Sequence, residues 1–244
     1  GTSIGQFFSS LQEIVTAPSD LAPRVVALEQ GKLLADSFND VAAVVQQLKD
    51  GIITQANQEI DSINLLANEL GTLNQQIASA GVNKVNNALL DRRDALIDEI
   101  SESVGVSVSL GSSGAANLTI GDSGRGPVLV EGNKVTPMGI DPEYTLISFV
   151  MSPGVANIYT SQVTKGALAG LADGYATVAS VMNDIDHLAY TLVQDMNAIH
   201  KAGLDMDGLP GKNIFQDIDL NLTPNPTNAG EIRAEAQIHD YSIL

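Results

Sequence analysis

Three histidines and many carboxylates are the residue types in this chain that suit acid–base or metal chemistry. His187 lies within a periodic apolar segment and His200 near its end. A histidine in the last turn of a helix more often complements the helix dipole than acts as a base. Asp205, Asp207 and Gly208 resemble the start of a calcium loop, but the glycine comes too early and no glutamate fills the twelfth position. We interpret that segment as a turn and predict no metal ligands.

The segment Asp91-Arg92-Arg93-Asp94 sets two cations between two carboxylates. An acid–base pair is one interpretation, and a specific contact with another subunit is a second. We favour a third, an ion-paired helix face in which Asp94 and Asp98 lie within reach of arginines on neighbouring turns. The chain has no H-E-x-x-H, G-x-S-x-G, P-loop or G-x-G-x-x-G unit. We therefore predict no catalytic residue, no cofactor and no enzymatic activity.

Composition narrows the classes of partner. The 244-residue chain has a formal net charge of −17, which argues against binding to nucleic acid or to anionic membrane surfaces. It has no cysteine, so disulfides and thiolate metal sites are excluded. No apolar run reaches the roughly 18 residues that indicate a membrane-spanning helix. We expect no nucleic acid and no membrane among its partners.

The longest element is predicted to be a helix over residues 20–80. Apolar residues recur there at steps of three or four, which keeps one stripe of a helix apolar. Ser19 or Asp20 can cap its start, and Pro23 fits its first turn. A continuous helix of about 60 residues would be roughly 90 Å long and would need partner helices. The residues expected to face the core are Val41, Val45, Leu48, Ile52, Ala56, Ile60, Ile63, Leu66, Leu70, Leu73 and Ile77.

A helical hairpin is the alternative for this segment. Each internal glycine weakens a helix by about 1 kcal/mol relative to alanine, and Lys49-Asp50-Gly51 is typical of a helix end. The stripe nevertheless stays in phase from Leu48 to Ile52, and no cluster of turn residues follows. We favour one continuous helix.

Two neighbouring positions define the expected core face of this helix. Ile63 lies in the middle of the stripe, so Ile63→Asp should be strongly destabilising. Asn64 lies off the stripe, so Asn64→Asp should change little.

Further helices are predicted at residues 3–16, 88–104 and 167–201. A polar loop at 82–87 precedes the second of them and makes it an antiparallel neighbour of the long helix. The helix at 167–201 has an apolar stripe as regular as that of the helix at 20–80, and we expect these two stripes to pack together. Its members are Leu168, Leu171, Tyr175, Val178, Met182, Ile185, Leu188, Leu192, Met196 and Ile199.

The period changes from 3.6 to two after the helix at 88–104. Val106, Val108 and Leu110 alternate with serine, which is typical of a strand, and glycine-rich turns follow. The strands expected in this region fall at 106–110, 118–120, 128–130, 144–150 and 157–163.

We therefore predict a mainly α fold with β structure, in which an elongated bundle of long helices carries an inserted small β subdomain and the start of a second β domain. Residues 1–105 and 165–204 would form the discontinuous helical domain, and 106–164 the β insertion. Residues 205–244 would be a linker at 223–228 and a truncated strand-like run at 231–244. Because the chain starts on Gly1 and stops within that run, we expect it to be a fragment.

Five blocks of the sequence resemble the family of bacterial flagellar hook-associated protein 1. Residues 89–100, LLDRRDALIDEI, followed by Val104-Gly105-Val106, resemble the family's LLDQRDxLxxELS…VGV stretch. The other blocks, in the family's order, are FFSSLQ…PSD at 7–20, the helix at 63–77 with its NQQI end, GALAGL at 166–171, and AIHKAGLDMDG at 198–208 with Phe215 beyond. Three positions depart from the pattern, namely Arg92 for Gln, Ala169 for Gly, and Ile214 before Phe215.

The resemblance implies a structural subunit of the bacterial flagellum at the hook–filament junction. The implied partners are identical subunits and the neighbouring hook and junction proteins. The implied location is the extracellular flagellum, reached by the flagellar type III export route. The family's terminal helices, which by resemblance line the inner tube and carry the export signal, are missing here. The motif residues with implied structural roles are Leu90, Asp91, Arg93, Asp94, Leu96, Glu99, Gly105, His200 and Gly203.

Two other function classes stay open on the residues alone. A coiled-coil fragment of a bacterial surface adhesin or sensor would share the apolar stripes but lack the β segment and the LDRRD element. A wall-cleaving hydrolase would use a carboxylate pair and turn over peptidoglycan. Because the two stripes should bury each other and the net charge is −17, we expect the fragment to be an elongated monomer.

Overall fold

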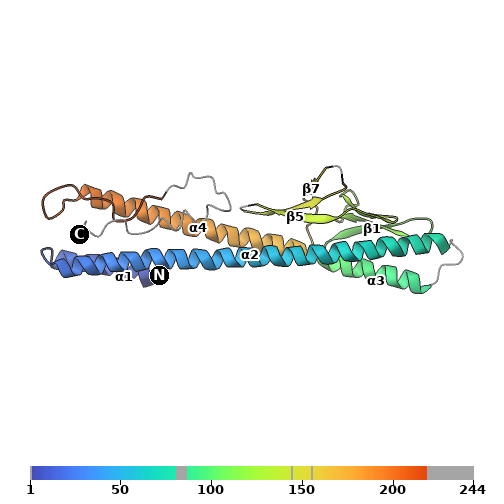
Figure 1. Cartoon of the computed structure of the whole chain (residues 1–244), viewed down its shortest axis with the longest axis horizontal. Helices are drawn as coiled ribbons and strands as arrows, with labels where there is room; N and C mark the ends of the chain where they lie inside the picture. The colour runs from blue at the N-terminus through green and yellow to red at the C-terminus, as the bar shows by residue number, and fades with distance from the viewer. Residues whose placement is uncertain (1, 81–86, 144, 155, 219–244) are drawn as a thin grey trace. The chain divides into compact units, whose positions relative to one another are not determined.

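The computed structural model describes residues 2–80, 87–143, 145–154 and 156–218 (Figure 1). The chain divides into two compact units. Unit 1 comprises Gly1–Leu48 and Ser180–Leu244, and unit 2 comprises Lys49–Ala179. Residues 82–86 of the expected loop at 82–87, the linker at 223–228 and the strand-like run at 231–244 lie outside the described residues, and Asn87 is the first residue of α3.

Four helices account for most of the described chain, so the predicted mainly α fold with β structure is confirmed. They are α1 (Thr2–Thr16), α2 (Leu21–Ala80), α3 (Asn87–Ser103) and α4 (Ala167–Ala202). Helix α2 runs unbroken through Gly51, so the hairpin alternative is wrong. Its first turn is capped by Asp20, whose Oδ1 accepts a hydrogen bond from the Ala22 N–H at 3.1 Å.

The core of unit 1 joins α1, the first part of α2, the second part of α4 and the segment that follows α4. Phe7 of α1 meets Phe215 edge to face, with ring centroids 5.7 Å apart. This contact between Phe7 and Phe215 holds the segment after α4 against α1. The buried members of this core are Phe7, Leu34, Ala189, Val193, Met196, Ile214, Phe215 and Ile218.

Part of the predicted core stripe in unit 1 is wrong. Val41 and Leu48 of α2 and Leu188 and Ile199 of α4 are exposed. The α2 residue that faces the core is instead the next one along the chain, as at Ala42. Steps of three and four define an apolar stripe, but they do not decide which of two adjacent apolar stripes is covered.

Unit 2 contains two small antiparallel sheets beside α2 and α3 (Figure 1). One sheet has the order β1-β2-β3-β4 and the other β5-β6-β7. The predicted strands did not include β4 and β5, because β4 is only two residues long and β5 contains Gly139 and Pro142, which usually weaken strands. The strands are β1 (Val106–Leu110), β2 (Ala116–Ile120), β3 (Val128–Glu131), β4 (Lys134–Val135), β5 (Met138–Pro142), β6 (Ile147–Met151) and β7 (Ile158–Thr160).

The core of unit 2 is a single cluster of buried residues that come from the helices and from both sheets. Ile63 of α2, Leu96 of α3 and Leu118 of β2 are all fully buried in it. The predicted core face of α2 is therefore confirmed within unit 2, where Ala56, Ile60, Ile63, Leu70, Leu73 and Ile77 are buried. The domain boundaries predicted at 105, 165 and 204 stay a prediction.

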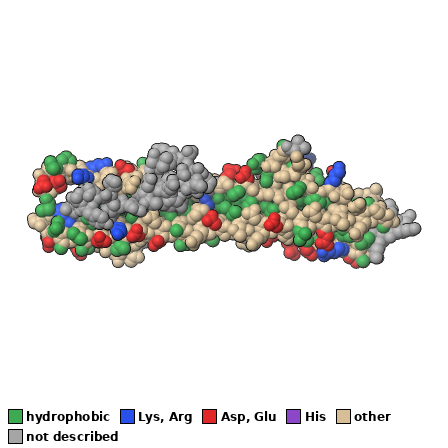
Figure 2. Space-filling model, viewed as in Figure 1, with side chains coloured by type: hydrophobic (Ala, Val, Ile, Leu, Met, Phe, Trp, Pro, Cys, Tyr) green, Lys and Arg blue, Asp and Glu red, His purple; other side chains and the backbone are tan. Residues whose placement is uncertain are grey.

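Surface chemistry agrees with the acidic composition. Carboxylate side chains are spread over the visible face rather than gathered at one place (Figure 2). Within the residues that the structure describes, no helix combines the length and the apolarity that crossing a membrane requires.

Candidate functional site

Helix α3 carries the motif residues of the LLDRRD block, and its buried face holds it against α2 and the first sheet. Arg93, Leu96, Ile97 and Ile100 recur at helical spacing and are buried. Leu96 and Ile100 have no exposed surface. Leu90 packs against the same core from a half-buried position, whereas Asp91 is exposed. One apolar face with one buried arginine thus sets the position of α3.

Arg93 links α3 to the turn between β1 and β2. Its Nη1 donates a hydrogen bond to the carbonyl oxygen of Gly114 at 2.6 Å. Its Nε and Nη2 lie 2.8 Å and 2.6 Å from Oδ1 of Asp94. Arg93 is only 8% exposed, so water competes little for its bond to Gly114, whereas the Asp94 side chain is 60% exposed and that pair is partly solvated.

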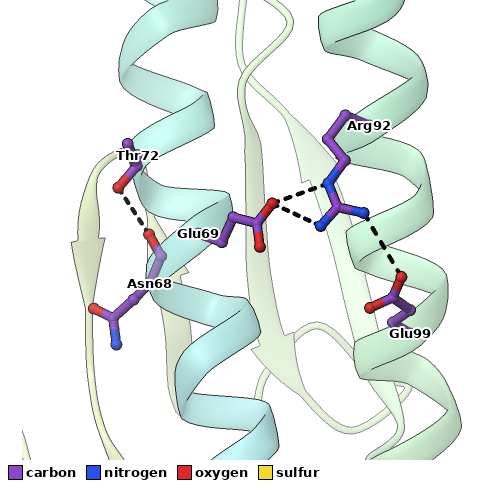
Figure 3. Close-up of polar contacts among 5 residues, drawn as sticks. All are labelled: Asn68, Glu69, Thr72, Arg92 and Glu99. Atoms are coloured by element: carbon purple, nitrogen blue, oxygen red, sulfur yellow. Dashed lines mark hydrogen bonds and ion pairs between the residues drawn. The ribbon is translucent and has the colours of Figure 1, made fainter.

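The adjacent Arg92 has a different role, since it faces solvent between α3 and α2 (Figure 3). Its Nε and Nη2 donate to Oε1 of Glu69 at 2.9 Å and 2.7 Å, and its Nη1 lies 3.8 Å from Oε1 of Glu99. Hydrogen bonding to Glu69 raises the pKa of Arg92. Helix α3 does carry an ion-paired face, but the carboxylates that pair with Arg92 are Glu69 and Glu99 rather than the predicted Asp94 and Asp98. Among the described residues, Asp98 forms no ion pair.

Two asparagines of α2 bind the main chain of the two sheets, and sequence reasoning assigned neither a site. Asn74, 1% exposed, donates from Nδ2 to the carbonyls of Ala116 and Gly132 at 2.7 Å and 2.8 Å. Its Oδ1 accepts from the Ala116 N–H at 2.8 Å. Asn64 exchanges the same kind of pair with Met138, both at 2.9 Å. Each amide therefore pairs with the first residue of a strand, β2 or β5.

A usable signal existed for only one of these asparagines. Asn74 stands four residues after Leu70 and three before Ile77, so it lies on the buried face, where an amide needs partners. Asn64 lies beside that face, and its partner is distant in sequence. Asn64→Asp was expected to change little, but the two hydrogen bonds to Met138 lead us to expect a loss of stability instead.

The end of α4 holds the following segment in the same way. Asn197, 2% exposed, accepts at Oδ1 from the N–H groups of Ile214 and Phe215, both at 3.0 Å. Its Nδ2 donates to the Phe215 carbonyl at 2.8 Å. The Nδ1 of His200 pairs with the carbonyl oxygen of Lys212 at 2.5 Å, and Gly203 accepts from the Gly211 N–H at 3.0 Å. His200 and Gly203 therefore hold the segment at residues 211–212, which folds back along the end of α4.

Gly105 closes the β segment of unit 2 at its base. Its N–H donates to the carbonyl of Lys165 at 3.2 Å, and its carbonyl accepts from the Gly121 N–H at 2.7 Å. The chain thus enters and leaves the β segment at adjacent points. Gly166 follows with φ of +84°, and a Cβ there would lie 2.7 Å from backbone atoms of Ser103. Only glycine fits this crossing without displacement.

The polar residues described above hold helices to the sheets and to the segment after α4. The motif's arginines and carboxylates are paired or exposed, and the asparagines bind main chain. Over residues 2–80, 87–143, 145–154 and 156–218, no three His, Asp or Glu side chains come together as a metal site would require. The arrangement fixes helices and sheets in place.

The chain is similar to known proteins along its whole length. The family model described as the flagellar hook-associated protein FlgK helical domain matches residues 1–215. Flagellar hook-associated protein 1 of Escherichia coli K12 is 28% identical over 100% of this chain and 46% of its own length. The corresponding proteins of Salmonella typhimurium LT2 and Bacillus subtilis 168 are 29% and 24% identical, over 99% and 97% of this chain and 47% and 52% of their own lengths.

A solved structure is similar as well. The flagellar hook junction protein FlgK from Burkholderia pseudomallei superposes with a TM-score of 0.78 at 26% identity, covering 88% of this chain and 40% of that one. The present chain spans about half the length of the curated relatives it matches.

Proposed function

Because the chain belongs to the flagellar hook-associated protein FlgK family, we propose that it forms part of a structural subunit of the bacterial flagellum that joins hook to filament. The observation that carries this proposal is the family match over residues 1–215. Within that span the motif residue Arg93 and the asparagines Asn74 and Asn197 attach helices to the sheets and to the segment after α4, and contacts of this kind suit a structural subunit.

The proposed partners are identical subunits and the neighbouring hook and junction proteins. The proposed location is the extracellular flagellum, reached through the flagellar type III route. The proposed role is not enzymatic. The surface adhesin or sensor alternative is disfavoured by the family match and by the β segment between α3 and α4.

Deletion of the parent gene in the source bacterium tests this proposal. A missing junction should leave hooks assembled and filaments absent, because the filament then has nothing to attach to. Electron microscopy of the cells and swimming in soft agar measure the two effects, and a plasmid copy should restore both. Deletion cells that carry normal filaments and swim normally would contradict the proposal.

A further inference from the structure

A tight turn follows α4 and contains one of the chain's three Asp-Gly pairs, Asp207-Gly208. The Asp205 N–H donates to the carbonyl oxygen of Leu209 at 2.8 Å, and the Gly208 N–H donates to the carbonyl oxygen of Asp205 at 3.1 Å. Among the described residues, the hydrogen bonds of 204–209 all join members of this short segment to one another. The segment that resembles the start of a calcium loop is therefore a turn held by its own bonds.

The carboxylate of Asp205 closes this turn. Its Oδ1 accepts hydrogen bonds from the Asp207 N–H at 2.9 Å and from the Leu209 N–H at 2.8 Å. Gly208 has a φ of +78°, a left-handed conformation that glycine adopts without strain. Because one carboxylate oxygen holds both sides of the turn, its loss would leave Gly208 freer to move.

The other two Asp-Gly pairs lie inside long helices. Asp50-Gly51 belongs to α2, and Asp173-Gly174 belongs to α4. In a helix each of these glycine N–H groups donates to the carbonyl four residues earlier, and freeing it requires the surrounding helical turns to open. A short turn held by its own bonds opens at a smaller free-energy cost than the interior of a packed helix. The chain thus presents the same dipeptide in two backbone settings.

An Asp-Gly pair rearranges with water as the only other reactant. The glycine nitrogen attacks the aspartate Cγ, the N–Cγ bond forms and the Cγ–O bond breaks, and the oxygen leaves as water with the amide proton and the proton of the carboxylic acid. Water then opens the cyclic imide. Opening at the N–Cγ bond restores aspartate, whereas opening at the original peptide bond leaves the main chain running through Cγ, which is isoaspartate. Glycine favours the attack because it has no side chain to hinder it.

We propose that Asp207-Gly208 is a site of spontaneous isoaspartate formation in the folded protein, and that the Asp205 carboxylate controls the rate by keeping the turn closed. The Gly208 nitrogen attacks only after its bond to the Asp205 carbonyl has opened. Because the step is intramolecular, it requires motion of the turn rather than a surface open to a partner. The inference uses no feature of the proposed function and does not depend on it.

The product would change the turn itself. Isoaspartate adds one carbon to the main chain between residues 207 and 208 and leaves a free carboxylate on Cα of residue 207. The two N–H groups that bond to Asp205 Oδ1 belong to Asp207 and Leu209, one on each side of the added carbon. Both bonds cannot keep their lengths once the chain between them is longer, so the modified turn should stay open.

Incubation of the whole chain at neutral pH, below its unfolding temperature, tests the proposal. The three Asp-Gly pairs fall in different tryptic peptides, and chromatography with electron-transfer fragmentation distinguishes isoaspartate from aspartate of the same mass. Isoaspartate should accumulate at Asp207 at least about tenfold faster than at Asp50 or Asp173. In urea, where the helices and the turn are all unfolded, the three pairs should react at similar rates.

Variants test the control by Asp205. Asp205→Ala removes the acceptor and should raise the rate at Asp207 at least about threefold, because the turn opens more often. Asp205→Asn keeps Oδ1 as an acceptor and is the matched control, expected to react as the unsubstituted chain does. Asp207→Glu should form no isoaspartate at this position and gives the baseline of the method. Thermal melts verify that each variant folds.

Two results would overturn the proposal. The first is a folded chain in which Asp207 forms isoaspartate no faster than Asp50 and Asp173, while all three pairs react in urea. The second is an equal rate in Asp205→Ala and Asp205→Asn, which would show that the carboxylate does not control the step.

Discussion

Arg92 and Arg93 show how strongly burial changes the role of one residue type. Their guanidinium groups each hold a carboxylate, but only that of Arg93 is withdrawn from water. A charged hydrogen bond to a main-chain carbonyl in a half-buried turn contributes more than an ion pair in solvent.

Arg93→Gln should therefore destabilise the chain by about 2–3 kcal/mol, since it removes the bonds to Gly114 and Asp94. Arg92→Gln is the matched control and should leave the unfolding midpoint nearly unchanged, because its side chain is 46% exposed. Urea titration followed by circular dichroism measures both. Equal losses would contradict the assignment of separate roles.

Asn64→Asp should cost about 1–3 kcal/mol, because the carboxylate cannot donate to the Met138 carbonyl and repels it. Asn68, one turn later and exposed, donates to the Asn64 carbonyl within its own helix, so Asn68→Asp should change little. Hydrogen exchange at the Met138 amide gives a local measure, expected to rise only in the first variant. Unchanged protection there would argue against the side-chain pairing.

At the scale of elements, periodicity predicted the helices because each has a long apolar face. It placed the core face of α2 correctly around Ile63, where a sheet and α3 cover it. It failed at Val41 and Leu48, because coverage depends on neighbours that the local pattern does not contain. The amide contacts of Asn64 and Asn197 were equally out of reach, since their partners are fixed only when the sheet and the returning segment are folded.

The assigned face of α2 makes its own prediction. Ile63→Asp should destabilise unit 2 by at least about 3 kcal/mol, because Ile63 is fully buried and the new charge has no partner there. Leu65→Asp, two residues away and 70% exposed, should have a small effect. Denaturant melts compare them, and similar small losses would refute the assigned face.

The two glycines of the GALAGL block should respond oppositely to alanine. Gly166→Ala should cost at least about 1–2 kcal/mol, because its φ is +84° and the new Cβ meets Ser103. Gly170→Ala should stabilise α4 by about 0.5–1 kcal/mol, because nothing beyond the adjoining backbone of α4 lies within 4 Å of that Cβ. Thermal unfolding measures the shifts, and a destabilising Gly170→Ala would contradict the open space.

For the whole molecule, the net charge of −17 sets the behaviour in solution. The expectation that both apolar stripes are fully buried is wrong at Val41, Leu48 and Leu188, but nearby exposed carboxylates such as Asp40 and Asp184 oppose pairing with a second copy of the chain. We predict a monomer at tens of micromolar and physiological salt. Light scattering coupled to size exclusion measures the mass, and a concentration-independent dimer would contradict the prediction.

The amides of Asn64, Asn74 and Asn197 also bear on what prolonged heating does to the protein, because the ordered helices protect them from deamidation and unfolding removes that protection. Deamidation turns an asparagine into an aspartate, and asparagine is among the thermolabile residue types. At Asn74, deamidation would replace Nδ2, which donates to the carbonyls of Ala116 and Gly132, by an oxygen that repels both carbonyls. Each event would also add one negative charge. Deamidation at these positions during prolonged unfolding should therefore prevent a strand or the segment after α4 from pairing with its helix again on cooling.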